Sequence, residues 1–347
     1  MGPDDLTPAF FADLLGLPVA AVERQRIGTG QVGMNIRCTL TYASDVPDGA
    51  PATLVAKMPS SDEASRAAGV ATRTYEREAK FYREVQPTVH VRTPRCYLAE
   101  WDPDTHDTLL VLEDLAPAEQ GDQIAGCSLH QAAAAVTELA RLHAPRWDDP
   151  ALFDLDWLTR GDLDLRGAEL QAFYQWCWPQ FAAYYAASIP SELLLPGEHF
   201  GAGAARWLAV GVEPWTVTHN DYRLDNLLFA TPAGGYPVAV VDWQTPSHGP
   251  CGTDLAYFVG AGLQVPERRA HEQELVEQYR SAMASEGVSV GADDLWDQYR
   301  WGIWHGVLMA VVSSTIVGHT ERGDAMFVAM YTRHAQHAID LQATTLL

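Results

Sequence analysis

One stretch of the sequence restricts the possible folds more than any other: the octapeptide His219-Asn-Asp-Tyr-Arg-Leu-Asp-Asn226 and the residues after it. Two apolar runs come next, on either side of a turn rich in proline and glycine at residues 231–237. This pattern predicts an antiparallel β-hairpin over residues 227–241. Because Asn226 directly precedes the first strand and Asp242 directly follows the second, we expect both side chains at the open end of the hairpin.

Three oxygen-bearing side chains of this segment predict phosphoryl-transfer chemistry. The oxygens of Asn226 and Asp242 suit Mg²⁺, which takes one or two protein ligands and completes its shell with water and nucleotide phosphates. Asp221 lies five residues before Asn226, close enough to accept the proton of a hydroxyl group or to orient the attacking oxygen. The spacing His-x-Asp-x-x-x-x-Asn matches the catalytic loop of kinases. Taken singly, each residue could instead serve a turn, but the hairpin between them favours a shared site.

Three glycines, Gly28, Gly30 and Gly33, form a G-x-G-x-x-G motif that two kinds of nucleotide-binding protein share. In a dinucleotide fold the motif follows a strand and opens a helix. Here the glycines lead straight into residues 35–42, whose strict alternation of apolar and polar side chains predicts a strand. We therefore expect a loop between strands that covers phosphates with its backbone N–H groups, although a plain glycine turn remains the alternative.

A lysine near the end of the next predicted strand, residues 52–58, is a candidate phosphate ligand. The run Val-Ala-Lys57 is typical of the kinase strand whose lysine reaches the α- and β-phosphates. A lysine at a strand end can also be merely solvated. Residues 74–85 predict a helix whose apolar stripe carries Glu78, which would hold Lys57 in place. Glu76 competes for this role but falls off the stripe, and as an exposed helix charge either glutamate could be inert.

The remaining pattern predicts strands first and helices afterwards. Residues 109–115 form an apolar strand that runs into a loop containing proline and glycine, so we place a boundary between residues 1–113 and 114–347. The spacing of apolar residues then predicts long helices at 128–144, 165–187 and 266–285. The expected fold class is therefore α+β, with a small antiparallel sheet in one lobe and a larger, mainly helical second lobe.

Two further polar residues have more than one interpretation. Asp254 stands in the first turn of a predicted helix, where it could cap the helix or brace the catalytic loop. His143 is expected to be a core histidine of the helix at 128–144. We find no Ser-His-Asp or metal-histidine set that competes with the phosphoryl-transfer interpretation.

The charge and the cysteines exclude several classes of partner. Lys and Arg total 23 against 45 Asp and Glu, a formal net charge of −22, which disfavours nucleic acid and anionic membranes. The five cysteines are far apart and lack a Cys-x-x-Cys pair, so neither disulfides nor a zinc site is indicated. The N-terminus carries acid where a signal peptide needs base, and the longest apolar stretch is too short to span a bilayer. We therefore expect a cytoplasmic protein.

Together these motifs resemble the aminoglycoside phosphotransferase and choline kinase superfamily, small-molecule kinases similar in fold to protein kinases. The segment from His219 to Phe229 resembles the catalytic loop of phosphotransferase domains joined to acyl-CoA dehydrogenases. Val-Asp242-Trp-Gln and the later Asp254-Leu-Ala-Tyr-Phe resemble the ecdysteroid-kinase-like branch. The resemblance runs from Gly28 to about Arg333. One departure is Asn220, where the superfamily often has glycine; asparagine tolerates a left-handed backbone nearly as well.

The resemblance implies a role for each matching residue. Asp221 would be the catalytic base, with His219 as a second residue of the catalytic set, and Asn226 and Asp242 would be the Mg²⁺ ligands. Lys57 and Glu78 would position the phosphates of ATP. The segment from Leu112 to Leu115, with Glu113 within it, would bind adenine as the hinge, and the glycines would cover the phosphates.

The predicted activity is therefore transfer of the γ-phosphate of MgATP to a hydroxyl of a small molecule. A catalytically silent nucleotide-binding module and a nicotinamide-dependent oxidoreductase remain as alternatives. The acceptor stays open between a hydroxylated lipid-like, steroid-like or acyl compound and a polycationic aminoglycoside, which would suit the net charge. Aromatic and Met residues of the second half could line an apolar acceptor pocket or simply belong to the core: Trp176, Trp178, Tyr184, Tyr185, Trp301, Trp304 and Met309. The oligomeric state cannot be inferred from the sequence.

Overall fold

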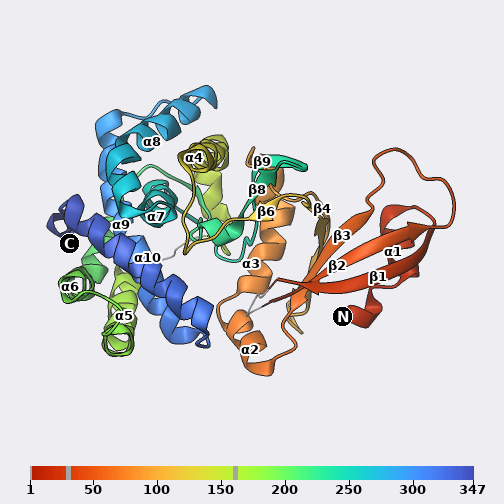
Figure 1. Cartoon of the computed structure of the whole chain (residues 1–347), viewed down its shortest axis with the longest axis horizontal. Coiled ribbons are helices and arrows are strands. Elements are labelled where there is room, and N and C mark those ends of the chain that lie inside the picture. Colours follow the sequence, from red (N-terminus) through yellow and green to blue (C-terminus); the bar gives the residue numbers. More distant parts are fainter. Residues whose placement is uncertain (1, 29–32, 159–162) are drawn as a thin grey trace. The chain divides into compact units, whose positions relative to one another are not determined.

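The computed structural model describes residues 2–28, 33–158 and 163–347. The chain divides into two units, each described here by itself. The first contains Met1–Thr88, Thr93–Pro117 and Val241–Thr245, and the second contains Val89–Arg92, Ala118–Val240 and Pro246–Leu347. A β-sheet dominates the first unit and helices dominate the second (Figure 1), which is the α+β, two-lobed fold expected from the sequence. The sequence pattern predicts a boundary after residue 113. The first unit extends to Pro117 and also includes the later segment Val241–Thr245.

The first unit is built from five strands and three short α-helices in the described part of the chain. In chain order these are α1 (Pro8–Leu15), β1 (Val19–Ile27), β2 (Gly33–Tyr42), β3 (Thr53–Pro59), α2 (Glu63–Ala71), α3 (Thr74–Lys80), β4 (Cys96–Trp101) and β5 (Thr108–Glu113). The strands lie in the order β1-β2-β3-β5-β4, and every neighbouring pair is antiparallel. The strands predicted at 35–42, 52–58 and 109–115 are confirmed, whereas β1 and α1 were not anticipated.

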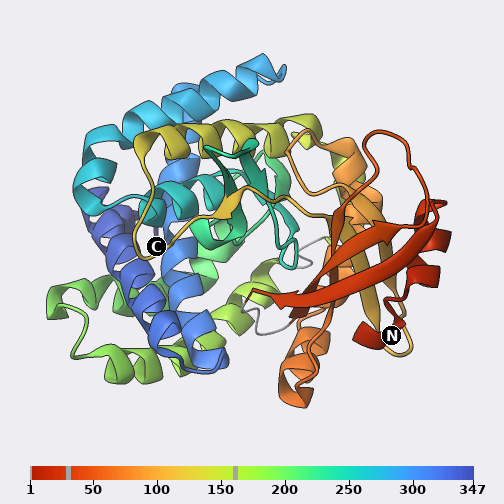
Figure 2. The ribbon, with the colours of Figure 1, turned by 45° about the vertical axis from the view of Figure 1, so that its right-hand side comes forward.

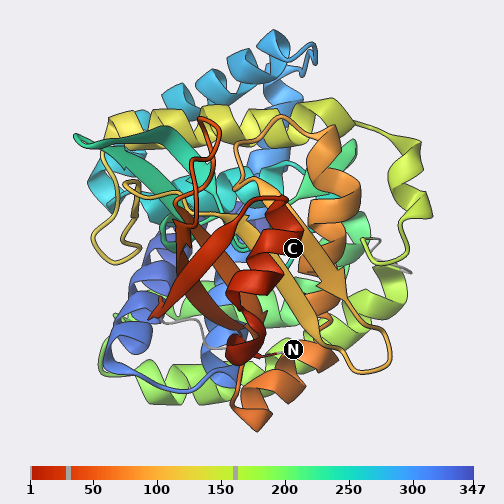
Figure 3. The same ribbon diagram turned by 90° about the vertical axis from the view of Figure 1, so that its right-hand side faces the viewer.

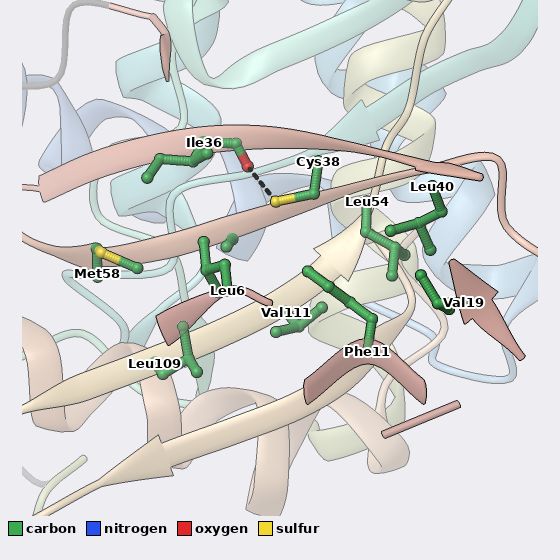
Figure 4. Close-up of a cluster of buried hydrophobic side chains, with 11 residues drawn as sticks. Leu6, Phe11, Val19, Ile36, Cys38, Leu40, Leu54, Met58, Leu109 and Val111 are labelled. Carbon is green, nitrogen blue, oxygen red and sulfur yellow. Dashed lines mark hydrogen bonds between the residues drawn. The ribbon is translucent and has the colours of Figure 1, made fainter. Parts of the chain in front are cut away.

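Alternation of side chains along the strands puts the apolar core of this unit on one face of the sheet. Helix α1 lies in front of the sheet in the view of Figure 3. Phe11 on α1 and Leu6 before it are both buried against this face (Figure 4). The strand residues of this core are Val19, Ile36, Cys38, Leu40, Leu54, Ala56, Met58, Leu109 and Val111. Because Lys57 lies between two of these residues on β3, its side chain leaves the sheet on the opposite face.

The helix predicted at 74–85 is observed as α3 followed by a π-helical turn, Phe81–Val85. Its predicted apolar stripe is buried, and Glu78 in that stripe is 2% exposed. The expectation that Glu76 would be an exposed charge is wrong, because Glu76 is 7% exposed. Its carboxylate is instead neutralised by Arg73 at 2.7 Å and Lys80 at 2.8 Å on the same helix.

The second unit contains short strands and long helices. In chain order these are β6 (Glu119–Gln120), α4 (Leu129–His143), α5 (Leu163–Tyr185), α6 (Leu195–Val210), β7 (Trp215–Thr218), β8 (Leu227–Thr231), β9 (Gly234–Val240), β10 (Ser247–Pro250), α7 (Gly252–Gly262), α8 (Val265–Ser285), α9 (Ala292–Ile316) and α10 (Glu321–Asp340). The helices predicted at 128–144, 165–187 and 266–285 are confirmed as α4, α5 and α8. Figure 2 shows α4 running alongside α8.

Sequence signals explain where several of these elements begin and turn. Ser128 caps α4 by accepting a hydrogen bond from the backbone N–H of Gln131, whose side chain reaches back to Ser128. The predicted hairpin is observed as β8 and β9, with Leu227 paired to Val240. The glycine at the hairpin turn, Gly234, has a φ of 129°, a backbone conformation that other residues rarely adopt.

The centre of the second unit is a close crossing of α7 and α9. Glycines at the crossing let the two backbones approach: an added Cβ on Gly302 would lie 1.9 Å from the carbonyl oxygen of Gly252. The helix α7 is buried over its whole length, so the residues on it face other parts of the protein rather than water. Within the described residues, none of the helices combines the length and the apolar character needed to cross a membrane.

Candidate active site

The catalytic-loop segment predicted at 219–226 connects β7 to β8, and its backbone is held by Asp254 on α7. The Asp254 carboxylate accepts hydrogen bonds from the backbone N–H of His219 at 2.6 Å and of Asn220 at 2.7 Å. Asn220 has a φ of 62°, so the left-handed backbone expected at this position is present. His219 accepts a hydrogen bond from the backbone N–H of Asp221 through Nδ1 at 3.2 Å, which shapes the loop from within.

Asp254 is fully buried and remains charged because of its partners. Burial alone would raise the pKa of Asp254, but the hydrogen bond from His143, the nearby His219 and its backbone N–H together lower it. His143 donates from Nε2 at 3.3 Å, and its Nδ1 lies 2.8 Å from the hydroxyl of Tyr279. Asp254 thus stands in the first turn of α7 and also braces the loop, while His143 is a buried core histidine that holds the brace.

Asp221, the candidate base, has a carboxylate that three side chains contact. Asn226 donates from Nδ2 to Oδ2 at 2.7 Å, and Arg223 donates from Nε to Oδ1 at 3.0 Å and to Oδ2 at 3.2 Å. Tyr257 donates its hydroxyl to Oδ1 at 3.1 Å. The Asp221 side chain is 21% exposed, so it is fixed in direction yet open to a small molecule.

Asn226 is 4% exposed, and its amide nitrogen also donates to the backbone carbonyl of Asp221 at 2.9 Å. Because the nitrogen end of the amide is engaged by Asp221, the oxygen end Oδ1 points away from that carboxylate. An amide oxygen is a hard ligand of the kind that Mg²⁺ takes in proteins. The donor set of Asn226 therefore fits a divalent ion, with the carboxylate of Asp221 close to it.

A second cluster lies in the first unit and brings together three other predicted site residues, Lys57, Glu78 and Asp242. Lys57 Nζ lies 2.7 Å from Glu78 Oε1 and 2.7 Å from Asp242 Oδ1. Gln244, two residues after Asp242, donates to Glu78 at 3.4 Å, and Trp243 between them stacks on Phe81. The Glu78 side chain is 3% exposed and that of Asp242 is 38% exposed, so Lys57 links a buried carboxylate to an accessible one.

The electrostatics of this cluster keep Lys57 positively charged. Burial disfavours a charge on Lys57, but Asp242 and Glu78 outweigh burial and raise the pKa of Lys57. Burial also raises the pKa of Glu78; Lys57 opposes this rise and Asp242 adds to it. A buried ammonium with two anionic partners is well suited to bind phosphate oxygens, because a phosphate can take the place of the accessible partner.

The glycine motif connects β1 to β2, two antiparallel strands, as expected for a loop that covers phosphates rather than for a dinucleotide fold. Gly28 has a φ of 71°, which favours glycine. Gly33 begins β2 close to the lysine cluster, since an added Cβ would lie 3.5 Å from Lys57 Cε and 3.8 Å from Gln244 Nε2. Gly30 lies outside the described residues.

The expected hinge, Leu112 to Leu115, spans the end of β5. Glu113 accepts a hydrogen bond from the backbone N–H of Arg95 through Oε2 at 2.9 Å, and Leu115 is buried at 8% exposure. Asp114 between them pairs with Arg37 of β2 through contacts of 2.6 and 3.0 Å. This pair ties the segment to the sheet, and no local pattern predicts it because Arg37 lies 77 residues earlier in the chain.

Sequence reasoning also missed residues that surround the catalytic loop. Arg223 is 19% exposed and lies between two carboxylates, at 3.0 Å from Asp221 and 2.8 Å from Asp225. The Asp225 carboxylate in turn accepts a hydrogen bond from the backbone N–H of Gln123 at 3.0 Å. An arginine two residues after the candidate base was a usable signal for a phosphate-binding cation, whereas the contacts of Tyr257 and Gln123 depend on distant segments.

The aromatic residues considered for an acceptor pocket divide between the core and the surface. Trp301 and Trp304 on α9 are 3% and 0% exposed and belong to the core. Trp176 and Tyr184 on α5 are 58% and 56% exposed. The exposed pair is therefore available to a ligand, whereas the tryptophans of α9 are not.

Comparison with known proteins gives both a family and a fold. A model described as the phosphotransferase enzyme family matches residues 47–290. No curated protein sequence matches. Among solved structures, a Plasmodium vivax ethanolamine kinase is similar at a TM-score of 0.53 with 11% identity, over 95% of this chain and 84% of that one.

Two aminoglycoside phosphotransferases are also similar in structure. The ADP-bound aminoglycoside phosphotransferase APH(2'')-Ib has a TM-score of 0.52 with 11% identity, over 94% of this chain and 97% of that one. The GDP and kanamycin complex of APH(2'')-IIIa has a TM-score of 0.51 with 11% identity, over 88% and 90% of the two chains. At these identities the structural likeness shows the fold.

Proposed function

Since the chain belongs to the phosphotransferase enzyme family, we propose that this small-molecule phosphotransferase transfers the γ-phosphate of MgATP to a hydroxyl of its acceptor. The observation that carries the proposal is the contact of Asp221 with Asn226 at 2.7 Å, in a loop that Asp254 holds by two backbone N–H groups. Such a loop offers a carboxylate to an acceptor hydroxyl and an amide oxygen to a metal ion.

Each candidate residue has a defined task in this proposal. Asp221 accepts the hydrogen of the acceptor hydroxyl and directs its oxygen at the phosphorus. Lys57, held by Glu78, binds phosphate oxygens of the nucleotide. Asn226 and Asp242 hold Mg²⁺, which neutralises phosphate charge when it is bound. Positioning and charge neutralisation supply most of the rate enhancement of phosphoryl transfer. The main contribution of Asp221 is therefore to orient the acceptor hydroxyl, and proton transfer to its carboxylate contributes less.

The parts proposed to bind the nucleotide follow the family pattern. Gly28, Gly30 and Gly33 cover the phosphates with backbone N–H groups, and Glu113 and Leu115 belong to the segment that receives the base. The ADP and GDP complexes among the similar structures make both ATP and GTP worth testing as donors. We propose ATP, which the hinge interpretation of residues 112–115 implies.

Two observations bear on the acceptor and favour different classes. The formal net charge of −22 favours a cationic amino alcohol or aminoglycoside, in line with the names of the similar structures. The exposed Trp176 and Tyr184 favour a hydroxylated compound with an apolar body. A screen must therefore include both classes.

The proposal is tested by nucleotide consumption with a panel of acceptors: ethanolamine, choline, kanamycin, sugars, hydroxyacyl-CoAs and sterol-like alcohols. We expect ADP release that depends on Mg²⁺ and on one class of acceptor. Asp221→Asn should lower kcat at least about 100-fold. Asp107→Asn is the matched control, because Asp107 pairs with Arg66 at 2.7 Å in the first unit, and it should stay within about twofold of wild type.

Other outcomes distinguish the alternatives. Nucleotide binding without turnover by any acceptor would favour a silent module. Thermal stabilisation by NADH but not by MgATP would favour an oxidoreductase. An Asp221→Asn variant that keeps more than about a tenth of the wild-type kcat would show that Asp221 is not the base.

A further inference from the structure

Tyr257 joins the catalytic loop to the interior of the second unit through one hydrogen bond. Its hydroxyl donates to Asp221 Oδ1 at 3.1 Å, although Tyr257 belongs to α7 and follows Asp221 by 36 residues. Tyr257 is 2% exposed. It lies three residues after Asp254, a spacing that puts both side chains on the same face of the helix. One turn of α7 therefore contacts the loop twice, at its backbone through Asp254 and at its base through Tyr257.

The ring of Tyr257 has little freedom to move. It stacks on His334 of α10 with centroids 5.4 Å apart and planes 4° apart, and it meets His305 of α9 edge-on at 5.2 Å. His305 in turn donates from Nε2 to the backbone carbonyl of Asn220 at 2.7 Å. Burial and the neighbouring Asp221 raise the pKa of Tyr257 well above its ordinary value, so the hydroxyl keeps its proton and acts as a donor.

The contacts of Asp221 differ between its two oxygens. A carboxylate has about four lone-pair positions, two on each oxygen. On Oδ1 they are taken by Tyr257 at 3.1 Å and Arg223 at 3.0 Å. On Oδ2 one is taken by Asn226 at 2.7 Å, while Arg223 makes only the longer contact of 3.2 Å, which it shares with Oδ1. Each oxygen therefore has one donor of its own, Tyr257 on Oδ1 and Asn226 on Oδ2, and Arg223 contacts both.

We propose that Tyr257 is a positioning residue: by holding Oδ1 of Asp221, opposite the Asn226 contact on Oδ2, it fixes the direction in which the carboxylate meets the acceptor hydroxyl. The proposal rests on the proposed function, because it assigns a direction to the base of that reaction. Without the tyrosine hydroxyl, Oδ1 loses the only one of its two donors that does not also contact Oδ2, and the carboxylate can turn about its Cβ–Cγ bond. The acceptor would then still bind, but its oxygen would be aimed at the phosphorus less often.

The test is Tyr257→Phe, which removes the hydroxyl and keeps the ring between His305 and His334. We expect kcat with the best acceptor to fall about tenfold to 100-fold, with KM for MgATP within about twofold of wild type. The matched control is Tyr299→Phe. Tyr299 is fully buried on α9 and donates to a carboxylate, Glu272, at 3.3 Å, but it does not contact Asp221. The control should keep the wild-type kcat.

A double-mutant cycle identifies the route of the effect. If Tyr257 acts through Asp221, Tyr257→Phe should lower kcat by less than about twofold in the Asp221→Asn background. An equal fall in both backgrounds, or a kcat of Tyr257→Phe within twofold of wild type, would overturn the proposal.

A crystal structure of the wild type and of Tyr257→Phe gives a measurement that does not depend on turnover. We expect the wild-type Tyr257 hydroxyl within hydrogen-bond distance of Asp221, and a rotated or multiply oriented Asp221 carboxylate in the variant. A carboxylate unchanged in the variant, or a wild-type hydroxyl that bonds elsewhere, would overturn the positioning role. A wild type without phosphotransfer activity would instead contradict the proposed function. The two crystal structures would then still show whether the Tyr257 hydroxyl orients the Asp221 carboxylate.

Discussion

Arg322, near the start of α10, donates hydrogen bonds to both carboxylate oxygens of Asp225 in the catalytic loop, each at 3.1 Å. Asp225 is 6% exposed and also pairs with Arg223 at 2.8 Å. Burial would raise the pKa of Asp225, but the hydrogen bond from Arg322 and the charge of Arg223 lower it. Asp225, which lies between the candidate base Asp221 and the candidate metal ligand Asn226, therefore anchors the loop to the last long helix.

The two partners of this contact should differ in their effect on stability. Asp225→Ala leaves Arg223 without one of its anions, so we expect the free energy of unfolding to fall by about 2–4 kcal/mol. Arg322→Gln leaves Asp225 paired with Arg223, and because the Arg322 side chain is 56% exposed the loss should stay below about 1 kcal/mol. Urea denaturation of both variants measures this. Equal losses would mean that Arg322 is the main support of Asp225.

The two glutamates of α3 should differ in their effect on activity. Glu78→Gln removes one of the two anions at Lys57, so we expect kcat/KM for MgATP to fall about tenfold to 100-fold. Glu76→Gln is the matched control, two residues away on the same helix. The hydrogen bond from Arg73, with Lys80, lowers the pKa of Glu76 to about 2, and neither partner is a candidate ligand. Steady-state kinetics should leave Glu76→Gln within about threefold of wild type; the reverse order would assign the lysine partner to Glu76.

The glycine crossing of α7 and α9 should not tolerate a side chain. Gly302→Ala would put a Cβ 1.9 Å from the backbone oxygen of Gly252, and backbone cannot move aside as a side chain can. We expect a loss of about 3 kcal/mol or more in the free energy of unfolding. Gly318→Ala is the control, because its added Cβ would meet no atom within 4 Å. Thermal denaturation should show a lower Tm for the first variant only.

The buried His334 should make the protein less stable in mild acid. Burial, with the nearby His337 and His305, lowers the pKa of His334 well below its ordinary value, so the folded state keeps it neutral. As pH falls below about 6.5, the unfolded chain takes up a proton at this histidine and the folded chain does not. Stability should therefore decrease toward acid pH, by up to about 1.4 kcal/mol per pH unit from His334.

Replacing the histidine tests this pH dependence directly. His334→Phe keeps a ring beside Tyr257 and cannot titrate, so its stability should decline less steeply between pH 7 and pH 5 than that of the wild type. His271→Gln is the control, because the His271 side chain on α8 is 35% exposed. Urea denaturation over this pH range measures the slopes, and parallel curves for wild type and His334→Phe would contradict the expectation.

The sequence by itself determined the local elements and the spacing of the loop. Alternation of apolar residues predicted β2. The predicted strand at 52–58 is observed as β3, and Lys57 lies on the face of the sheet opposite the core because side-chain direction in a strand follows from position alone. The five-residue interval from Asp221 to Asn226 likewise brought their side chains together, since a short loop leaves few ways to separate them. These relationships depend on residues close in the chain, so a local pattern is enough to predict them.

The tertiary structure alone decided which of several plausible partners each charged residue has. Asp254 could have been only a helix-capping acid; packing of α7 against the loop made it the brace of His219 and Asn220 as well. The same packing brought Tyr257 to Asp221, which lies 36 residues earlier in the chain. Such contacts join segments whose approach is set by the whole core, and no local periodicity encodes the distance between them.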